Sequence, residues 1–351
     1  MDRRQFLQTL NANGVGALLP ASATTQLARQ PPGAKTAVVE EAGKGEWNTP
    51  KIGIVSVGAV GGDCLPTSGD RVRSLPHLNR TVAVGTCGAE LYGMNADRKV
   101  LLGDSKTLLN PHGAGLLDQS AEDQIAEAVA GLDMVLLVAG MAGATGTAPI
   151  VAQVLRAQGI HTLAFAVMPF DGEGPLRQQI VQARIRDLRH HVDALLPFVT
   201  NDFDPDTQKG WWQSAAAQQA PLAFMEVCQN VMNPVCRPGW VNVDFEDLRH
   251  IILSQEGDCA FGFGSAKDAH GAATAAIDHP LLGRGRLQRA SSALISIEAP
   301  QKLLQLQDSW TVLNSVREQI SRVAYMAFGT TYNEDLGKEV TVSILANGIR
   351  G

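Results

Sequence analysis

The sequence predicts an α/β protein with a parallel sheet, joined to a smaller α+β unit. Between residues 51 and 191, short apolar runs rich in branched side chains alternate with Gly-rich loops and helical stretches. This order is typical of parallel strands covered by helices on both faces. From residue 242 to residue 351, strand-like runs dominate. A chain of 351 residues is also longer than one ordinary core requires, which favours two units.

The composition excludes several classes of protein. The chain carries 29 Lys and Arg against 35 Asp and Glu, a net charge of -6, which argues against binding a nucleic-acid backbone by neutralising its phosphates. Its five cysteines are scattered and form no CxxC pair, so we expect reduced thiols and neither a disulfide framework nor a metal site. No run approaches the ~18 apolar residues of a transmembrane helix, and we expect no direct membrane insertion.

The first fifty residues differ from the rest. Arg3 and Arg4 precede a weakly apolar stretch that ends in small residues at Ala23, a pattern typical of a twin-arginine export signal. A flexible arm in which this pattern arose by chance is the alternative. Pro, Gly and charged residues between 24 and 50 indicate a linker under either interpretation. We therefore expect residues 1–50 to be a Tat-like segment or a disordered arm.

Seven elements are predicted in the first unit. Strands are expected where β-branched apolar runs end in Gly or Pro, at residues 51–58, 81–86, 134–140 and 161–170. Helices are expected where apolar residues recur at helical spacing, at residues 120–132, 149–158 and 176–191. Ser120 is the expected N-cap of the first helix, and the last helix carries Gln and Arg on its outer face.

Five elements are predicted in the second unit. Alternation of apolar and polar residues predicts strands, at residues 293–300, 323–333 and 338–348. Helices are expected at residues 246–253 and 312–321. Asp247, at the start of the first of these helices, is of a residue type that caps helix N-termini.

Two Gly-rich loops follow predicted strands and are the candidate ligand sites. The first Gly-rich loop contains Gly58, Gly61 and Gly62, and glycines at a strand-to-helix turn let backbone N–H groups approach a phosphate closely. A tight turn without a ligand explains the same residues. Asp63 counts against a phosphate, because its carboxylate repels one unless a cation intervenes.

The second loop, residues 140–147, is the more specific of the two. Gly143, Thr145, Gly146 and Thr147 lie between a predicted strand and a predicted helix, where backbone N–H groups and hydroxyls can form an anion-binding nest. A Walker-type loop would contain a Lys, and this loop has none. Any bound phosphate would therefore be held by backbone groups and hydroxyls.

The second loop and five other stretches carry a family resemblance. GMAGATGTAPIVA (140–152) resembles the signature loop of the tubulin/FtsZ family, and similar matches follow in order at 168–177, 191–202, 237–249, 276–282 and 340–349. The resemblance covers nearly all of residues 51–351 and is closer to bacterial FtsZ than to eukaryotic tubulin. It implies a Rossmann-like GTPase domain over 51–210, a connecting helix region over 211–241 and a smaller α+β C-terminal domain over 242–351.

The resemblance implies a GTP or GDP site, with Mg²⁺ as a candidate companion ion and no residue assigned as a metal ligand. The residues implied to contact the phosphates are Gly58, Gly61 and Gly62 on the α/β side, and Gly143, Thr145, Gly146 and Thr147 on the β/γ side. Glu173 and Arg177 are implied to contact the ribose and phosphates, and Asn201 to read the guanine. From the residues alone, Glu173 and Arg177 could equally form a surface i,i+4 pair, and Asn201 a turn.

The resemblance gives the NVDFED loop, residues 242–247, a role in a neighbouring molecule. Asn242, Asp244 and Asp247 are implied to face the nucleotide of the next subunit, where a carboxylate can orient or activate the attacking water. Hydrolysis would then depend on head-to-tail self-association into filaments, and on cytoplasmic GTP. The alternative is structural: Asn242 and Asp244 turn the chain and Asp247 caps the following helix.

Several positions depart from the family pattern. Ala142 and Ala144 replace glycines of the signature loop, and Pro66 and Pro76 predict that the first helix is short or broken. The family's base-holding aromatic and Asp have no counterpart near residues 218–222. We also expect the family's usual anchor-binding peptide to be absent. These departures leave a second interpretation open, a non-catalytic FtsZ-like filament subunit or regulator with weak nucleotide binding.

Overall fold

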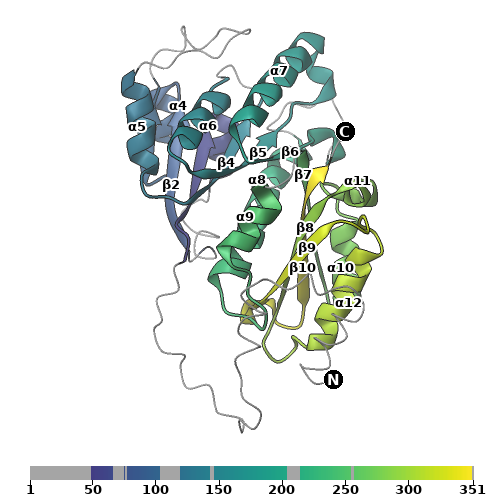
Figure 1. Cartoon of the computed structure of the whole chain (residues 1–351). Helices are drawn as coiled ribbons and strands as arrows, with labels where there is room; N and C mark the ends of the chain where they lie inside the picture. The colour runs from purple at the N-terminus through teal and green to yellow at the C-terminus, as the bar shows by residue number, and fades with distance from the viewer. Residues whose placement is uncertain are drawn as a thin grey trace.

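A computed structural model describes seven parts of the chain: residues 49–65, 75, 77–102, 119–142, 146–203, 214–253 and 257–349. The expected N-terminal arm lies outside these residues except for its last two positions, and so do Gly143 and Thr145 of the signature loop. Figure 1 shows an N-terminal unit and a C-terminal unit, with helix α8 between them. No helix in the described ranges is both long and apolar enough to cross a bilayer.

The N-terminal unit is a parallel sheet. Its strands are β1 (Ile52–Val57), β2 (Leu78–Gly85), β3 (Arg98–Leu101), β4 (Met134–Gly140), β5 (His161–Val167) and β6 (Ala194–Phe198), in the order β3-β2-β1-β4-β5-β6. The four predicted strands are confirmed. The central strands are buried along almost their whole length, as the continuous apolar runs require. Val57 pairs with Ala139, so the two Gly-rich loops leave the same edge of the sheet side by side.

Helices cover both faces of this sheet. They are α3 (Gly58–Asp63), α4 (Gly88–Tyr92), α5 (Gln119–Val129), α6 (Ala148–Ala157) and α7 (Pro175–His191). The side chains of β1 pack into two hydrophobic cores, one on each face of the sheet. Ile52 and Ile54 lie in one core, and Val55 and Val57 lie in the other. The expected short first helix is confirmed at six residues. Ser120 is not an N-cap, because α5 already begins at Gln119; its hydroxyl instead accepts a 3.3 Å hydrogen bond from Gln124.

Helix α8 (Ala215–Cys236) connects the two units and tolerates two prolines. Ser214 caps it by accepting a hydrogen bond from the backbone N–H of Ala217, and the helix continues through Pro221 and Pro234 for 22 residues. One face of α8 is buried against the sheet; Phe224 packs on Phe165 of β5 with ring centroids 5.4 Å apart. Burial of this face stabilises a helix that the prolines alone would weaken.

The C-terminal unit is a smaller α+β structure. Its helices are α9 (Phe245–Leu253), α10 (Ala269–Ile277), α11 (Gly283–Arg289) and α12 (Leu306–Arg317). Its strands are β7 (Asp258–Ala266), β8 (Ser292–Ala299), β9 (Tyr325–Tyr332) and β10 (Val340–Ile349), in the order β7-β10-β8-β9. Strand β10 is antiparallel to β7 and β8. The helix expected at 312–321 is shifted: it begins six residues earlier and ends at Arg317.

Candidate functional site

The first Gly-rich loop is a tight strand-to-helix turn. Gly58 adopts φ +72°, a backbone conformation that favours glycine. A Cβ at Gly61 would stand 2.6 Å from the carbonyl oxygen of Val138, and one at Gly62 would collide with Met94. Packing of α3 against the backbone of β4 is therefore sufficient to require glycine at 61, whereas a side chain at 62 would displace only the flexible end of Met94. Their contact with phosphates stays a prediction.

The signature loop presents an unpartnered hydroxyl where α6 begins. Gly146 has φ +29°, and Thr147, 2% exposed, is the N-cap residue but makes no side-chain cap hydrogen bond. Within the described ranges, Thr147 Oγ1 is buried without a hydrogen-bond partner. A buried hydroxyl at a helix N-terminus is the kind of donor that a bound oxyanion satisfies. Gly143 and Thr145, the other two predicted residues of this loop, lie outside the described residues.

Arg184 of α7 reaches the signature loop, and the sequence interpretation missed it. Its Nη1 donates a 3.1 Å hydrogen bond to the carbonyl oxygen of Met141. The expectation that the Arg residues of this helix lie on its outer face is wrong for Arg184. Helical spacing could have indicated that Arg184 faces inward, because it lies on the same side of α7 as the buried residues Val181, Ile185 and Leu188. Burial, followed by the charge of Arg177, lowers the pKa of Arg184.

Glu173, Arg177 and Asn201 follow the carboxyl ends of β5 and β6 and make two separate sets of contacts. Arg177 pairs with Glu173 at 2.6 Å, and the other carboxylate oxygen of Glu173 accepts from the backbone N–H of Phe170. Asn201 accepts from the backbone N–H of Asp171 at 3.2 Å and donates to its carboxylate at 3.1 Å. The i,i+4 pair and the turn role are thus both present. Neither excludes contact with a nucleotide on this edge.

The NVDFED loop holds its two carboxylates in different surroundings. Asp244 Oδ1 accepts a 2.7 Å hydrogen bond from the backbone N–H of Asp247, so Asp244 caps α9, and the expectation that Asp247 is the cap is wrong. Asp247 lies in the first turn, 8% exposed, and its Oδ2 is buried without a hydrogen-bond partner in the described structure. Burial, then the charge of Asp244, raises the pKa of Asp247 to about 6. Asn242 accepts a hydrogen bond from the backbone N–H of Gly239, as a turn residue does.

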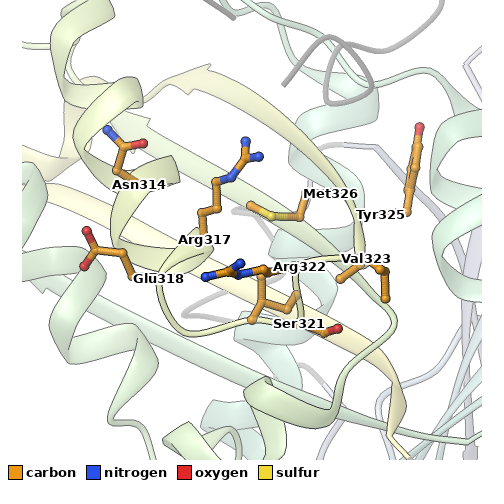
Figure 2. A pocket seen from close by; sticks show the side chains of 10 residues that line it. Asn314, Arg317, Glu318, Ser321, Arg322, Val323, Tyr325 and Met326 are labelled. Atoms are coloured by element: carbon orange, nitrogen blue, oxygen red, sulfur yellow. The ribbon is translucent and has the colours of Figure 1, made fainter. Parts of the chain in front are cut away.

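A cavity of about 910 Å³ lies between the end of α12 and the start of β9. Figure 2 shows the side chains that line it, which come from α12, the turn after it and the first residues of β9. Tyr325, one of them, contacts the ring of His250 edge-on with centroids 5.0 Å apart. Burial and the charges of Asp247 and Asp244 raise the pKa of Tyr325. Tyr325 therefore both lines this cavity and senses the charges of the two carboxylates.

A second cavity, of about 640 Å³, lies beside the first Gly-rich loop. Its lining includes Gly62, Cys87 and two acidic residues, Asp63 and Glu90, and the residues found to line it include no Lys or Arg. Mg²⁺ is usually held by one or two carboxylates together with phosphates and water, which these acidic residues fit. In the described part of the chain, no group of three or more His, Cys, Asp or Glu is placed to hold a metal ion.

Two family models match the chain. The GTPase domain of the tubulin/FtsZ family matches residues 72–203, and the C-terminal domain of the FtsZ family matches residues 257–350.

Curated relatives match across most of the chain. Cell division protein FtsZ of Magnetospirillum gryphiswaldense is 30% identical over 313 residues, 86% of this chain and 54% of that protein. The chain thus spans about half the length of that relative. Cell division protein FtsZ 1 of Halobacterium salinarum is 30% identical over 280 residues, 76% of this chain and 69% of that protein.

Solved structures share the fold. An empty FtsZ dimer from M. jannaschii gives a TM-score of 0.71 at 25% identity, covering 86% of this chain and 89% of that one. A GTPγS-bound protofilament of CetZ2 from Haloferax volcanii gives 0.67 at 19% identity, covering 86% of this chain and 93% of that one. The likeness to CetZ2 is one of fold.

Proposed function

Because the chain belongs to the tubulin/FtsZ family, we propose that it binds GTP, polymerises head to tail and hydrolyses GTP at the interface between subunits. The curated relatives are cell division proteins, which supports a role in cell division or in a related filament. We propose a cytoplasmic location because GTP is available there. Residues 51–210 would form the GTP-binding domain, 211–241 the connecting region and 242–351 the C-terminal domain.

The nucleotide site is proposed at the carboxyl edge of the parallel sheet. The turn at Gly58 and the start of α6 at Thr147 leave this edge from adjacent strands, and open α/β sheets bind ligands there. The phosphates would lie against these two loops. Asn201, with the pair Glu173–Arg177, would contact the nucleoside. The unpartnered hydroxyl of Thr147 supports an anionic ligand.

One observation carries the proposal that the catalytic carboxylates act on a different molecule. In the described structure, Asp244 and Asp247 interact with each other, with His250 and with Tyr325, and with no residue of either Gly-rich loop. Val243 donates a hydrogen bond to the carbonyl oxygen of Pro234, which holds the NVDFED loop at the far end of the 22-residue α8. A second copy could bring its nucleotide to this loop.

The chemistry would then be divided between two subunits. One subunit holds the γ-phosphate against its signature loop, and the other presents Asp247. Water attacks the γ-phosphorus, a water proton passes to the Asp247 carboxylate, and the bond from the γ-phosphorus to the β–γ bridging oxygen breaks. GDP leaves with the electron pair, and inorganic phosphate is the other product. A carboxyl with a pKa near 6 is suited to accept that proton near neutral pH.

The test is GTP turnover measured across protein concentrations. Assembly creates the site, so turnover per subunit should rise with concentration and level off once filaments form, with light scattering rising over the same range. Turnover per subunit that is independent of concentration would contradict the proposal, because hydrolysis would then occur within single subunits.

A second candidate function is a filament subunit that does not hydrolyse GTP. Ala142 in place of a signature-loop glycine favours it, as does the surface of α8 near Gln218, which offers no aromatic side chain. Filaments that sediment equally with GTP and with a non-hydrolysable analogue, and that release no phosphate, would support this candidate over the first.

A further inference from the structure

The turn that carries Asn201 is held by both units of the molecule. It is the short 3₁₀ turn η4 (Thr200–Asp202), which follows β6. Asn201 accepts a hydrogen bond from the backbone N–H of Asp171 in the N-terminal unit and donates one to its carboxylate. The next residue, Asp202, accepts a 3.2 Å hydrogen bond at Oδ2 from Nη2 of Arg286, in α11 of the C-terminal unit. Neighbouring residues of one turn are therefore bound to different units.

The guanidinium of Arg286 is fixed within its own unit. Its Nη1 donates hydrogen bonds to the carbonyl oxygens of Pro280, at 3.0 Å, and Leu281, at 3.1 Å. Because a guanidinium is planar and rigid, the bonds from Nη1 also set the direction in which Nη2 donates. The side chain is thus oriented toward Asp202 by the backbone of the C-terminal unit, and pairing requires little further ordering.

An aromatic contact joins the same two segments. Phe203, directly after the turn, stacks on Phe198 of β6 with ring centroids 4.6 Å apart. The ring of Phe203 also contacts that of His279, with centroids 6.2 Å apart. His279 immediately precedes the two residues whose carbonyls bind Arg286, and its Nδ1 accepts a 3.3 Å hydrogen bond from the backbone N–H of Leu281. Two contacts therefore fix η4 against residues 279–286 of the C-terminal unit.

We propose that Arg286 is a positioning residue of the nucleotide site, which acts through Asp202 to hold Asn201 where it contacts the nucleoside. The assignment rests on the proposed function and deepens it, because it makes the C-terminal unit part of nucleoside recognition. The side chains of Arg286 and Asp202 are 36% and 34% exposed, and ion pairs of such exposure add little to folding stability. The effect of Arg286 should therefore appear in ligand affinity more than in melting temperature.

The experiment measures binding of GDP to the full chain by calorimetry. Arg286→Gln should weaken GDP binding by about two- to fivefold, the range that an exposed ion pair supports. Arg284→Gln is the matched control. Arg284 lies on the same helix and also pairs with an aspartate, Asp278, at 2.7 Å, but both partners belong to the C-terminal unit. This control removes the same charge and should leave GDP affinity unchanged.

A double-mutant cycle with Asn201→Ala separates positioning from a general structural effect. Asn201→Ala alone should weaken GDP binding by about tenfold, as for loss of a hydrogen bond. Arg286→Gln added to Asn201→Ala should cause no further loss, because two residues that act through one contact are not additive. Thermal melting of each variant shows that it is folded, and Arg286→Gln should melt close to the wild type.

Three results would overturn the assignment while leaving the proposed function intact. They are an equal loss of affinity from Arg286→Gln in both backgrounds, unchanged GDP affinity in Arg286→Gln, and an equal loss in Arg284→Gln. A wild-type chain that binds no GDP would instead overturn the proposed function and this assignment with it. If Arg286→Gln does not fold, Arg286→Lys takes its place in the cycle, since lysine keeps the charge without the rigid guanidinium. A loss of the same size with and without Asn201 would then count against the proposal.

Discussion

The backbone N–H of Asp247 donates a 2.7 Å hydrogen bond to the carboxylate of Asp244. The two carboxylates therefore have different roles. Asp244 caps α9, and Asp247 is buried in the first turn of that helix. The negative charge of Asp244 adds to burial in raising the pKa of Asp247 to about 6. The proposed catalytic group is thus tuned by the residue that builds its helix.

The pH dependence of turnover should report Asp247. Its carboxyl accepts a proton only when ionised, so turnover at saturating GTP should be low below the pKa and rise as the pH increases through about 6. Asp247→Asn should lower turnover by ~10²–10⁴-fold and leave GTP affinity unchanged. A rate that is flat between pH 5 and 8 in the wild type would exclude Asp247 as the base.

The stability of the same variant should move in the opposite direction from its activity. The folded-state pKa of Asp247 lies above its ordinary value, so its contribution to stability is present at low pH and is lost as the pH rises through about 6. Asp247→Asn removes that loss. Above pH 6.5 the variant should melt no lower than the wild type in thermal unfolding; marked destabilisation would indicate a structural role.

Two substitutions at Asp244 separate capping from charge. Asp244→Ala removes the cap and should cost about 0.5–2 kcal/mol in the free energy of unfolding, measured by urea titration. Asp244→Asn retains a capping side chain, so stability should be nearly unchanged. The Asn variant also removes a negative charge beside Asp247, so the rise in turnover should shift to lower pH. An unshifted profile would show that the two carboxylates do not interact.

Thr147→Val tests the unpartnered hydroxyl. Valine has a similar shape and no polar atom, so the nucleotide-free protein should gain up to about 1 kcal/mol, because a buried group without a hydrogen bond is replaced. GTP affinity should fall about tenfold at the same time. Thr147→Ser keeps the hydroxyl and serves as the control. A loss of stability with unchanged GTP affinity would mean that the hydroxyl is bonded within the loop.

Base selectivity should be weak. The positions with which the family holds the guanine base are expected near residues 218–222 of α8, where Leu222 is 41% exposed and none of these five residues has an aromatic ring to stack on a purine. GTP should therefore be preferred over ATP by a smaller factor than in relatives with the aromatic residue. Competition between GTP and ATP for a fluorescent nucleotide measures this factor, and a strong preference for GTP would show that the base is held elsewhere.

Buried runs made most of the parallel sheet predictable. β1 and β4 are apolar almost throughout because both faces are covered. Three strands escaped prediction for local reasons. β3 has one buried residue, Val100, β6 contains Pro197, and β7 contains two glycines, of which Gly262 has no room for a Cβ beside Ala276. These three segments form strands because of their tertiary contacts more than because of the local strand preference of their residues.

The site was predictable in its loops and less so in its long-range contacts. Glycines and hydroxyls mark the turns at Gly58 and Thr147 in the sequence itself. Helical spacing places Arg184 in the buried stripe of α7, but it does not identify Met141, 43 residues away, as the residue that Arg184 contacts. The sequence does not distinguish Asp244 from Asp247 as the cap of α9, because Asp is a favoured cap residue at either position. The hydrogen bond from the backbone N–H of Asp247 to the carboxylate of Asp244 identifies Asp244 as the cap.

The most direct test of the shared active site mixes two inactive variants. Gly146→Asp places a carboxylate where phosphate should lie and should abolish GTP binding, while Asp247→Ala binds GTP but lacks the catalytic carboxylate. With each variant shown to be folded by thermal melting, the mixture should regain turnover, approaching about a quarter of the wild-type rate because random head-to-tail pairing makes about one interface in four competent. No turnover above the sum of the separate variants, with both folded and co-sedimenting, would contradict a site built from two subunits.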